Sequence, residues 1–297
     1  MHTAHAFPDP DSVTIDMDSE GYVGVPSNFT WRSEEVGELH IGGNEGHFDF
    51  TLPGIAAVAT FHDRVPWCEK RPEMGGPEGW LGSTPLLPCH YFVHSLASRT
   101  TYRLRLRNKP SSSSSSPPSP PPSSHLSGQG YAHMESNYGN HFPSGWLWCN
   151  AISPQREVKL LMVGGKFEIG PTAPTTWIVA FRSPRFEWTF RTTDLDKVTA
   201  RLDYSTRTLR LEARSRCGRR RIEVMMVAPP GSFGPPLYVP TRGGFSCLPG
   251  CRESFTATAH IKAVDEGGRG GGRRIVLEEV CEVPLAALEL GGALQRL

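Results

Sequence analysis

Short segments with alternating apolar residues recur along most of this chain, and turn-forming residues separate them. Leu39 and Ile41, then Phe48 and Phe50, alternate with polar or small residues on either side of a Gly-Gly-Asn-Glu-Gly turn, which predicts a β-hairpin. Hardly any segment shows the 3.6-residue period of an amphipathic helix. The chain is therefore predicted to be all-β, folded as an antiparallel sandwich or barrel. Further strands are expected at residues 54–61, 90–96, 101–107, 157–163, 175–182, 186–190, 198–204, 207–214, 221–227, 254–264 and 273–280.

The densest group of chemically distinctive residues lies in the stretch 131–150. It contains one carboxylate, Glu135, together with two histidines, several amides and two tryptophans. If its last residues are extended, the period of two places Trp146, Trp148 and Asn150 on one face of a strand and Leu147 and Cys149 on the other. Two interpretations stay open, an aromatic wall of a binding site or a core strand beside a polar turn.

In its order of residues, this stretch resembles the signature of the tocopherol cyclase family. The signature has an acid, then Asn-aromatic-Gly, Phe-Pro and Trp-x-Trp, and its residues here are Glu135, Asn137, Tyr138, Gly139, Phe142, Pro143, Trp146 and Trp148. Three further stretches follow in the family's order: Gly79-Trp80-Leu81-Gly82 before Pro88-Cys89-His90, then Cys251-Arg252-Glu253-Ser254, then Ala286 to Gly292. The resemblance covers residues 79–292.

The resemblance implies a lipocalin-like architecture with two barrel-like parts, of which the first is incomplete. It also implies a reaction of the intramolecular lyase class, in which a phenol oxygen adds across a prenyl double bond to close a chromanol ring without a cofactor. The substrate would be a prenylated phenol or hydroquinone. The chain departs from the family in three ways. Tyr138 replaces a usual tryptophan, Ala-Leu-Gln follows Gly291-Gly292 where Gly-Pro-Trp is usual, and the family's N-terminal region has no visible counterpart.

This reaction requires an acid beside an aromatic wall. Protonation of a trisubstituted alkene gives a tertiary carbocation, which an aromatic face stabilises while a dry pocket keeps water away. Glu135 is the predicted proton donor, by its place in the signature. The predicted substrate-contacting residues are Asn137, Tyr138, Phe142, Trp146, Trp148, Trp80, Glu253 and Glu289. Glu253 and Glu289 are alternative acids, and each of the three carboxylates has a purely structural interpretation as well.

Four parts are expected along the chain. Residues 1–33 form a poorly ordered leader, residues 34–108 an N-terminal β part, and residues 131–297 a C-terminal barrel-like part. Between the last two, residues 109–130 include a Ser/Pro tract that cannot bury a core. We interpret this tract as an expanded hairpin loop, because loop-closure entropy rises only slowly with length.

Composition restricts the partners. The 297 residues include 31 basic and 30 acidic side chains, so no overall charge favours binding to nucleic acid. Seven cysteines without zinc-finger spacing favour a reduced, intracellular protein. The chain shows no signal peptide and no apolar run that could span a bilayer, so contact with a membrane or lipid body is expected to be peripheral. The expected partner is a hydrophobic small molecule.

Three other groups of residues were weighed as sites. His90 and His94 are four residues apart, which would be metal-ligand spacing on a helix, but this region is predicted to be a strand, so metal binding is not favoured. Cys247 and Cys251 flank Leu-Pro-Gly and are more simply two ordinary thiols than a metal site or a bridge. The arginines between residues 214 and 221 favour a solvated hairpin tip over a lipid-phosphate or nucleic-acid contact. No metal site is predicted.

Two alternatives to a tocopherol cyclase-like enzyme stay open. One is another isoprenoid hydratase or cyclase of secondary metabolism that uses the same acid and aromatic wall. The other is a lipocalin-like protein that binds a lipid without catalysis. An acid within hydrogen-bond reach of a buried double bond would distinguish the enzymes from the binding protein.

Overall fold

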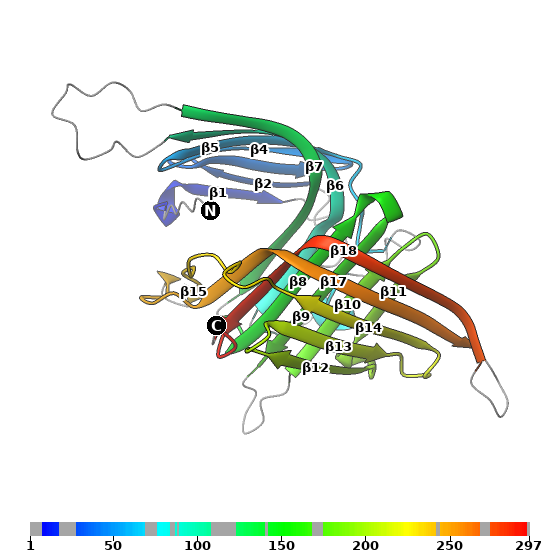
Figure 1. The fold of residues 1–297 in the computed structure, drawn as a ribbon. Helices are drawn as coiled ribbons and strands as arrows, with labels where there is room; N and C mark the ends of the chain where they lie inside the picture. Colours follow the sequence, from blue (N-terminus) through cyan, green and yellow to red (C-terminus); the bar gives the residue numbers. More distant parts are fainter. Residues whose placement is uncertain are drawn as a thin grey trace, which may run out of the picture. The chain divides into compact units, whose positions relative to one another are not determined.

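The computed structural model describes residues 8–17, 28–68, 76–83, 87, 89–107, 123–139, 142–167, 175–241, 244–267 and 274–295. The chain forms two compact units, the first made of residues 1–84 and 91–136 and the second of residues 85–90 and 137–297. Strands dominate both units (Figure 1). The prediction of an antiparallel all-β fold is thus confirmed.

A seven-stranded sheet contains the strands of the first unit, in the sequential order β1-β2-β3-β4-β5-β6-β7. Its elements are η1 (Pro10–Ser12), β1 (Val13–Met17), β2 (Asn28–Ser33), β3 (Gly37–Gly42), β4 (Glu45–Leu52), β5 (Ile55–His62), η3 (Gly79–Ser83), β6 (Cys89–Arg107) and β7 (Ser123–Gly139). The predicted hairpin is present as β3 and β4. Register places Phe48, Ala59 and Tyr102 side by side on β4, β5 and β6.

The core of the first unit lies on one face of this sheet, and its buried residues are Ile41, Ala59, Phe61 and Met134. Phe48 and Tyr102 pack against this cluster. Met134 on β7 belongs to this core. Because side chains alternate along a strand, its neighbours His133 and Glu135 point to the other face of the sheet.

A nine-stranded sheet forms most of the second unit. Its elements in chain order are β8 (Gly145–Ser153), η4 (Pro154–Arg156), β9 (Val158–Lys166), β10 (Thr175–Arg182), β11 (Glu187–Arg191), η5 (Thr192–Asp194), β12 (Lys197–Asp203), β13 (Thr208–Arg214), β14 (Arg220–Val227), β17 (Cys251–Gly267) and β18 (Arg274–Gly292). A separate two-stranded sheet pairs β15 (Pro240–Thr241) with β16 (Gly244–Phe245).

The nine-stranded sheet curls into a nearly closed barrel. Its order is β11-β10-β9-β8-β18-β17-β14-β13-β12, so the last strand of the chain pairs with the first strand of the sheet. Figure 1 shows the pronounced curvature of these strands. The two edges, β11 and β12, are consecutive in the chain and are joined by the tight turn η5. There the backbone N–H of Asp196 donates to the carbonyl of Arg191, and its carboxylate accepts from the N–H of Arg191.

Packed side chains fill the interior of this barrel. Alternate residues of each strand contribute to one continuous buried cluster, whose large members include Leu160, Met162, Phe181, Trp188, Phe190, Met226 and Ile261. On β8 the cluster takes Leu147 and Cys149, the residues expected to share a face. Trp146 and Trp148 therefore lie on the outer face of β8, and a ligand touching them would lie outside this core.

Two predictions about local structure were wrong. The leader 1–33 contains β1 and β2, because both segments alternate as strands do and pair with each other, with Ile15 opposite Trp31 and Met17 opposite Phe29. Residues 90–96 and 101–107 were predicted as separate strands but form one strand, β6. Its middle, Ala97 to Thr100, contains no glycine or proline to turn the chain, and Thr100 pairs with Phe61.

The Ser/Pro tract lies mostly outside the described residues, which omit 108–122. The tract connects β6 to its neighbour β7, as expected for a hairpin connection. Residues 123–130, which we assigned to the tract, belong to β7 instead. Residues 131–136, which we placed with the C-terminal part, cluster with the first unit.

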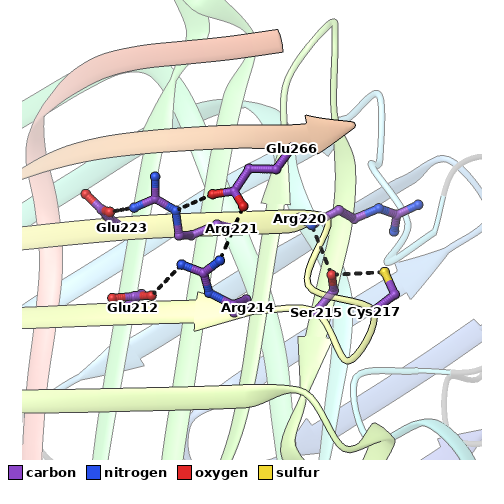
Figure 2. Close-up of polar contacts among 8 residues, drawn as sticks. All are labelled: Glu212, Arg214, Ser215, Cys217, Arg220, Arg221, Glu223 and Glu266. Atoms are coloured by element: carbon purple, nitrogen blue, oxygen red, sulfur yellow. Dashed lines mark hydrogen bonds and ion pairs between the residues drawn. The ribbon is translucent and has the colours of Figure 1, made fainter. Parts of the chain in front are cut away.

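The arginines near the β13–β14 turn are partly neutralised by acids (Figure 2). Arg214 and Arg221 both contact the carboxylate of Glu266, at 3.4 and 3.2 Å, and the Glu266 side chain is only 10% exposed. Arg214 also pairs with Glu212, and Arg221 with Glu223. The strand-borne arginines therefore stabilise the sheet rather than form a free basic patch.

Candidate active site

Glu135 is bonded to two proton-bearing side chains within the first unit. The hydroxyl of Tyr91 on β6 donates to Glu135 Oε2, and His133 Nε2 lies 2.7 Å from the same oxygen. The side chains of His133 and Glu135 are 7% and 24% exposed. These three residues form a polar group, the Tyr91–Glu135–His133 cluster, that is largely shielded from water.

The backbone around Tyr91 is held by a second acid. Glu78 is 8% exposed, and its Oε1 accepts a hydrogen bond of 2.8 Å from the N–H of Tyr91. Because a buried carboxylate is costly without partners, this contact is expected to fix the start of β6. It thereby helps to position the Tyr91 hydroxyl.

His94 belongs to the core side of the same strands. Its Nε2 lies 2.9 Å from Ser136 Oγ, and its ring packs against Phe29 at a centroid distance of 5.3 Å. Burial lowers the pKa of His94 to about 4, and the charge of Arg64 acts in the same direction while Glu135 opposes it. His94 is therefore a buried histidine that is neutral near pH 7.

His94 should make the protein less stable in acid. The unfolded chain binds a proton near pH 6.5 and the folded chain only near 4, so the unfolded state gains protons first as the pH falls. We expect the free energy of unfolding to fall by about 2 kcal/mol between pH 7 and pH 5 from this residue. Urea titrations of the parent protein and of His94→Gln at both pH values measure it. An equal loss in both proteins would contradict the prediction.

In the second unit, two predicted carboxylates face each other on neighbouring strands. Glu289 on β18 is paired in register with Trp148 on β8 and with Glu253 on β17. The indole N–H of Trp146 donates to Glu289 Oε1. The outer face of the barrel thus brings two acids and two tryptophans together.

Cys251 is part of the same face. Burial, the charge of Glu289 and the hydrogen bond from the thiol to Glu289 raise the pKa of Cys251 well above its ordinary range. The thiol therefore stays protonated and serves Glu289 as a second donor, beside Trp146. Both Cys251 and Cys247 are free thiols, so the bridge considered from their spacing is not formed.

The remaining predicted residues are dispersed. Trp80 lies in η3 and is 59% exposed, and Asn137 is exposed on β7. Phe142 packs against Trp146 with ring centroids 5.2 Å apart. Tyr138 lies on β7, and its side chain is outside the described residues, as are Asn140 and His141 of the same stretch.

The two sets of predicted residues belong to different units. Glu135 and Trp80 lie in the first, whereas Trp146, Glu253 and Glu289 lie in the second with the other predicted contacts. Sequence reasoning missed Tyr91 and the partnership of His133 with Glu135. The i, i+2 spacing of His133 and Glu135 on a strand was a usable signal, whereas nothing local linked Tyr91 to residues 44 positions away.

Within the part of the chain that the structure describes, no group of three or more His, Cys, Asp or Glu side chains could hold a metal ion. Among the described residues there is also no helix whose length and apolarity would allow it to cross a membrane.

Comparison with known proteins gives a distant structural similarity. No protein-family model matches the chain, and no curated protein matches it in sequence. Among solved structures, the chain is similar to kievitone hydratase from Nectria haematococca, with 9% sequence identity over 92% of this chain and 82% of that chain and a TM-score of 0.38. A similarity of this extent identifies neither a family nor an activity.

Proposed function

We propose that this protein catalyses a cofactor-independent, acid-catalysed addition to the double bond of a prenylated phenol. In the favoured form the phenol oxygen of the substrate adds to its own prenyl group, as in a tocopherol cyclase, and the product is a chromanol. In the alternative form water adds, and the product is a tertiary alcohol. Glu135 is the proposed proton donor in both.

The observation that carries the proposal is the Tyr91–Glu135–His133 cluster. A proton donor for an alkene must be kept from bulk water and must have a route by which it recovers its proton. Glu135 meets both conditions, since its carboxyl is mostly covered and its Oε2 contacts two groups that can carry a proton. The cluster contains no nucleophile–base pair of the kind used for acyl transfer.

The outer face of the barrel, within the second unit, offers a separate arrangement that suits the alternative acid Glu289. Trp146 and Trp148 flank Glu289 there, and the quadrupole of an indole ring stabilises a nearby cation. The barrel interior, by contrast, is filled by its own side chains. Simple storage of a lipid inside the barrel is therefore the weaker interpretation.

The proposal is tested by incubating the purified protein with a prenylated hydroquinone in D2O and analysing the products by mass spectrometry. Cyclisation gives an isomer that carries one deuterium on carbon, because the alkene is protonated from exchangeable sites. Hydration gives a product heavier by one water, which H2¹⁸O labels at the new hydroxyl. If the protein retains the lipid unchanged and neither product forms, catalysis is rejected and a lipid-binding protein is favoured.

A further inference from the structure

Both ring nitrogens of His133 face oxygen atoms. Nδ1 lies 3.4 Å from the backbone carbonyl of Leu96, and Nε2 lies 2.7 Å from Glu135 Oε2. A carbonyl oxygen can only accept a hydrogen bond, so this contact is a hydrogen bond when Nδ1 carries the hydrogen. In a neutral His133 that makes this bond, Nε2 is the bare nitrogen.

A bare Nε2 cannot lie 2.7 Å from a carboxylate oxygen, because two lone pairs would face each other. A hydrogen must lie between the two atoms, on His133 as an imidazolium or on Glu135 as a carboxylic acid. In either case the pair carries one more proton than a neutral histidine and an ionised carboxylate would carry between them. Its net charge is zero, which suits a site where His133 is 7% exposed.

The surroundings favour the form with the proton on His133 at rest. Tyr91 donates its hydroxyl hydrogen to the same Oε2, and an ionised carboxylate accepts two donors better than an acid does. His94 interacts electrostatically with both members of the pair, but it is neutral near pH 7 because burial lowers its pKa to about 4. Tyr91 bonds directly to the carboxylate of the pair.

We propose that His133 is the positioning residue that stores the reactive proton and returns it to Glu135, an inference that rests on the proposed function. Glu135 O–H gives its proton to one alkene carbon, and the π electrons form the new C–H bond. The phenol or water oxygen then forms a C–O bond to the tertiary cation and releases a proton. That proton returns to the pair, so acid and base are both restored and no co-reactant is consumed.

The stored proton is measurable without any substrate. We expect the parent protein at pH 7.5 to show either both His133 ring nitrogens protonated in ¹H–¹⁵N spectra or a carboxylic acid C=O band in infrared spectra that disappears in Glu135→Gln. In Glu135→Gln, His133 should become the neutral Nδ1–H form. His47, which faces Glu38 at 3.3 Å on the exposed surface, is the control and should not respond to Glu135→Gln. A neutral His133 without an acid band in the parent protein would overturn the inference.

The kinetic role is measured with His133→Gln, which keeps a donor toward Glu135 but stores no proton. We expect kcat to fall about 10- to 100-fold with little change in KM, and the alkaline limb of the pH–rate profile to move. A merely structural histidine would leave that limb in place, and an unchanged kcat and pH profile would refute the role. If no product forms with any protein, the proposed function fails, whereas the spectra still decide whether the proton is shared.

Discussion

Replacing Glu135 with glutamine is expected to lower kcat about 100- to 10 000-fold, the usual contribution of a general acid. Glutamine is nearly isosteric and still accepts from Tyr91, so the fold and KM should change little. It cannot release a proton to an alkene. Rates of product formation under saturating substrate, with circular dichroism to confirm folding, provide the measurement.

The same experiment distinguishes the three acids. Glu253→Gln and Glu289→Gln test the carboxylates of the second unit, and Glu212→Gln, whose side chain is 46% exposed on β13, serves as the inert control. If Glu135→Gln stays active while Glu289→Gln loses all activity, the proton donor lies beside the tryptophans instead. Loss in both would indicate that activity needs both acids, and the double variant would then show whether their losses add.

Much of the fold follows from local pattern. The strand at residues 175–182 has the predicted bounds. Those predicted at 186–190 and 198–204 are shifted by one residue, and the one predicted at 207–214 begins one residue later. Strict alternation of apolar and polar residues makes such strands predictable from the sequence, because one face of each strand must be apolar. The failures came where alternation was short, as in β1, or where a strand continued without a turn signal, as in β6.

The site was less predictable because its contacts are distant in sequence. The faces of β8 were predicted from a period of two, which Leu147 and Trp146 confirm. The bond from Trp146 to Glu289 joins residues 143 positions apart, and only the pairing of β8 with β18 brings them together. The order of the motifs could indicate that Trp146 and Glu289 are both candidate site residues, but not that they are in contact.

Gly291→Ala is expected to destabilise the barrel by about 3 kcal/mol. Gly291 lies opposite Trp146 on the neighbouring strand, and a methyl group there would overlap the atoms of the indole ring. Trp146 is 7% exposed, so its ring has little room to move, and displacing it would also break its hydrogen bond to Glu289. Urea unfolding measures the loss.

Two comparisons show whether the overlap is the cause. Gly145→Ala lies in the same sheet, where a new methyl group would make only ordinary contacts at 3.5 Å, and should change stability by less than about 1 kcal/mol. In a Trp146→Leu background the ring is gone. The further loss of stability from Gly291→Ala should then be much smaller, because mutations at contacting residues are coupled in their effects. A cost that persists there would assign Gly291 to backbone geometry rather than to the space that Trp146 occupies. If the cost disappears, glycine at 291 is what lets an indole lie flat across two strands and present its N–H to Glu289.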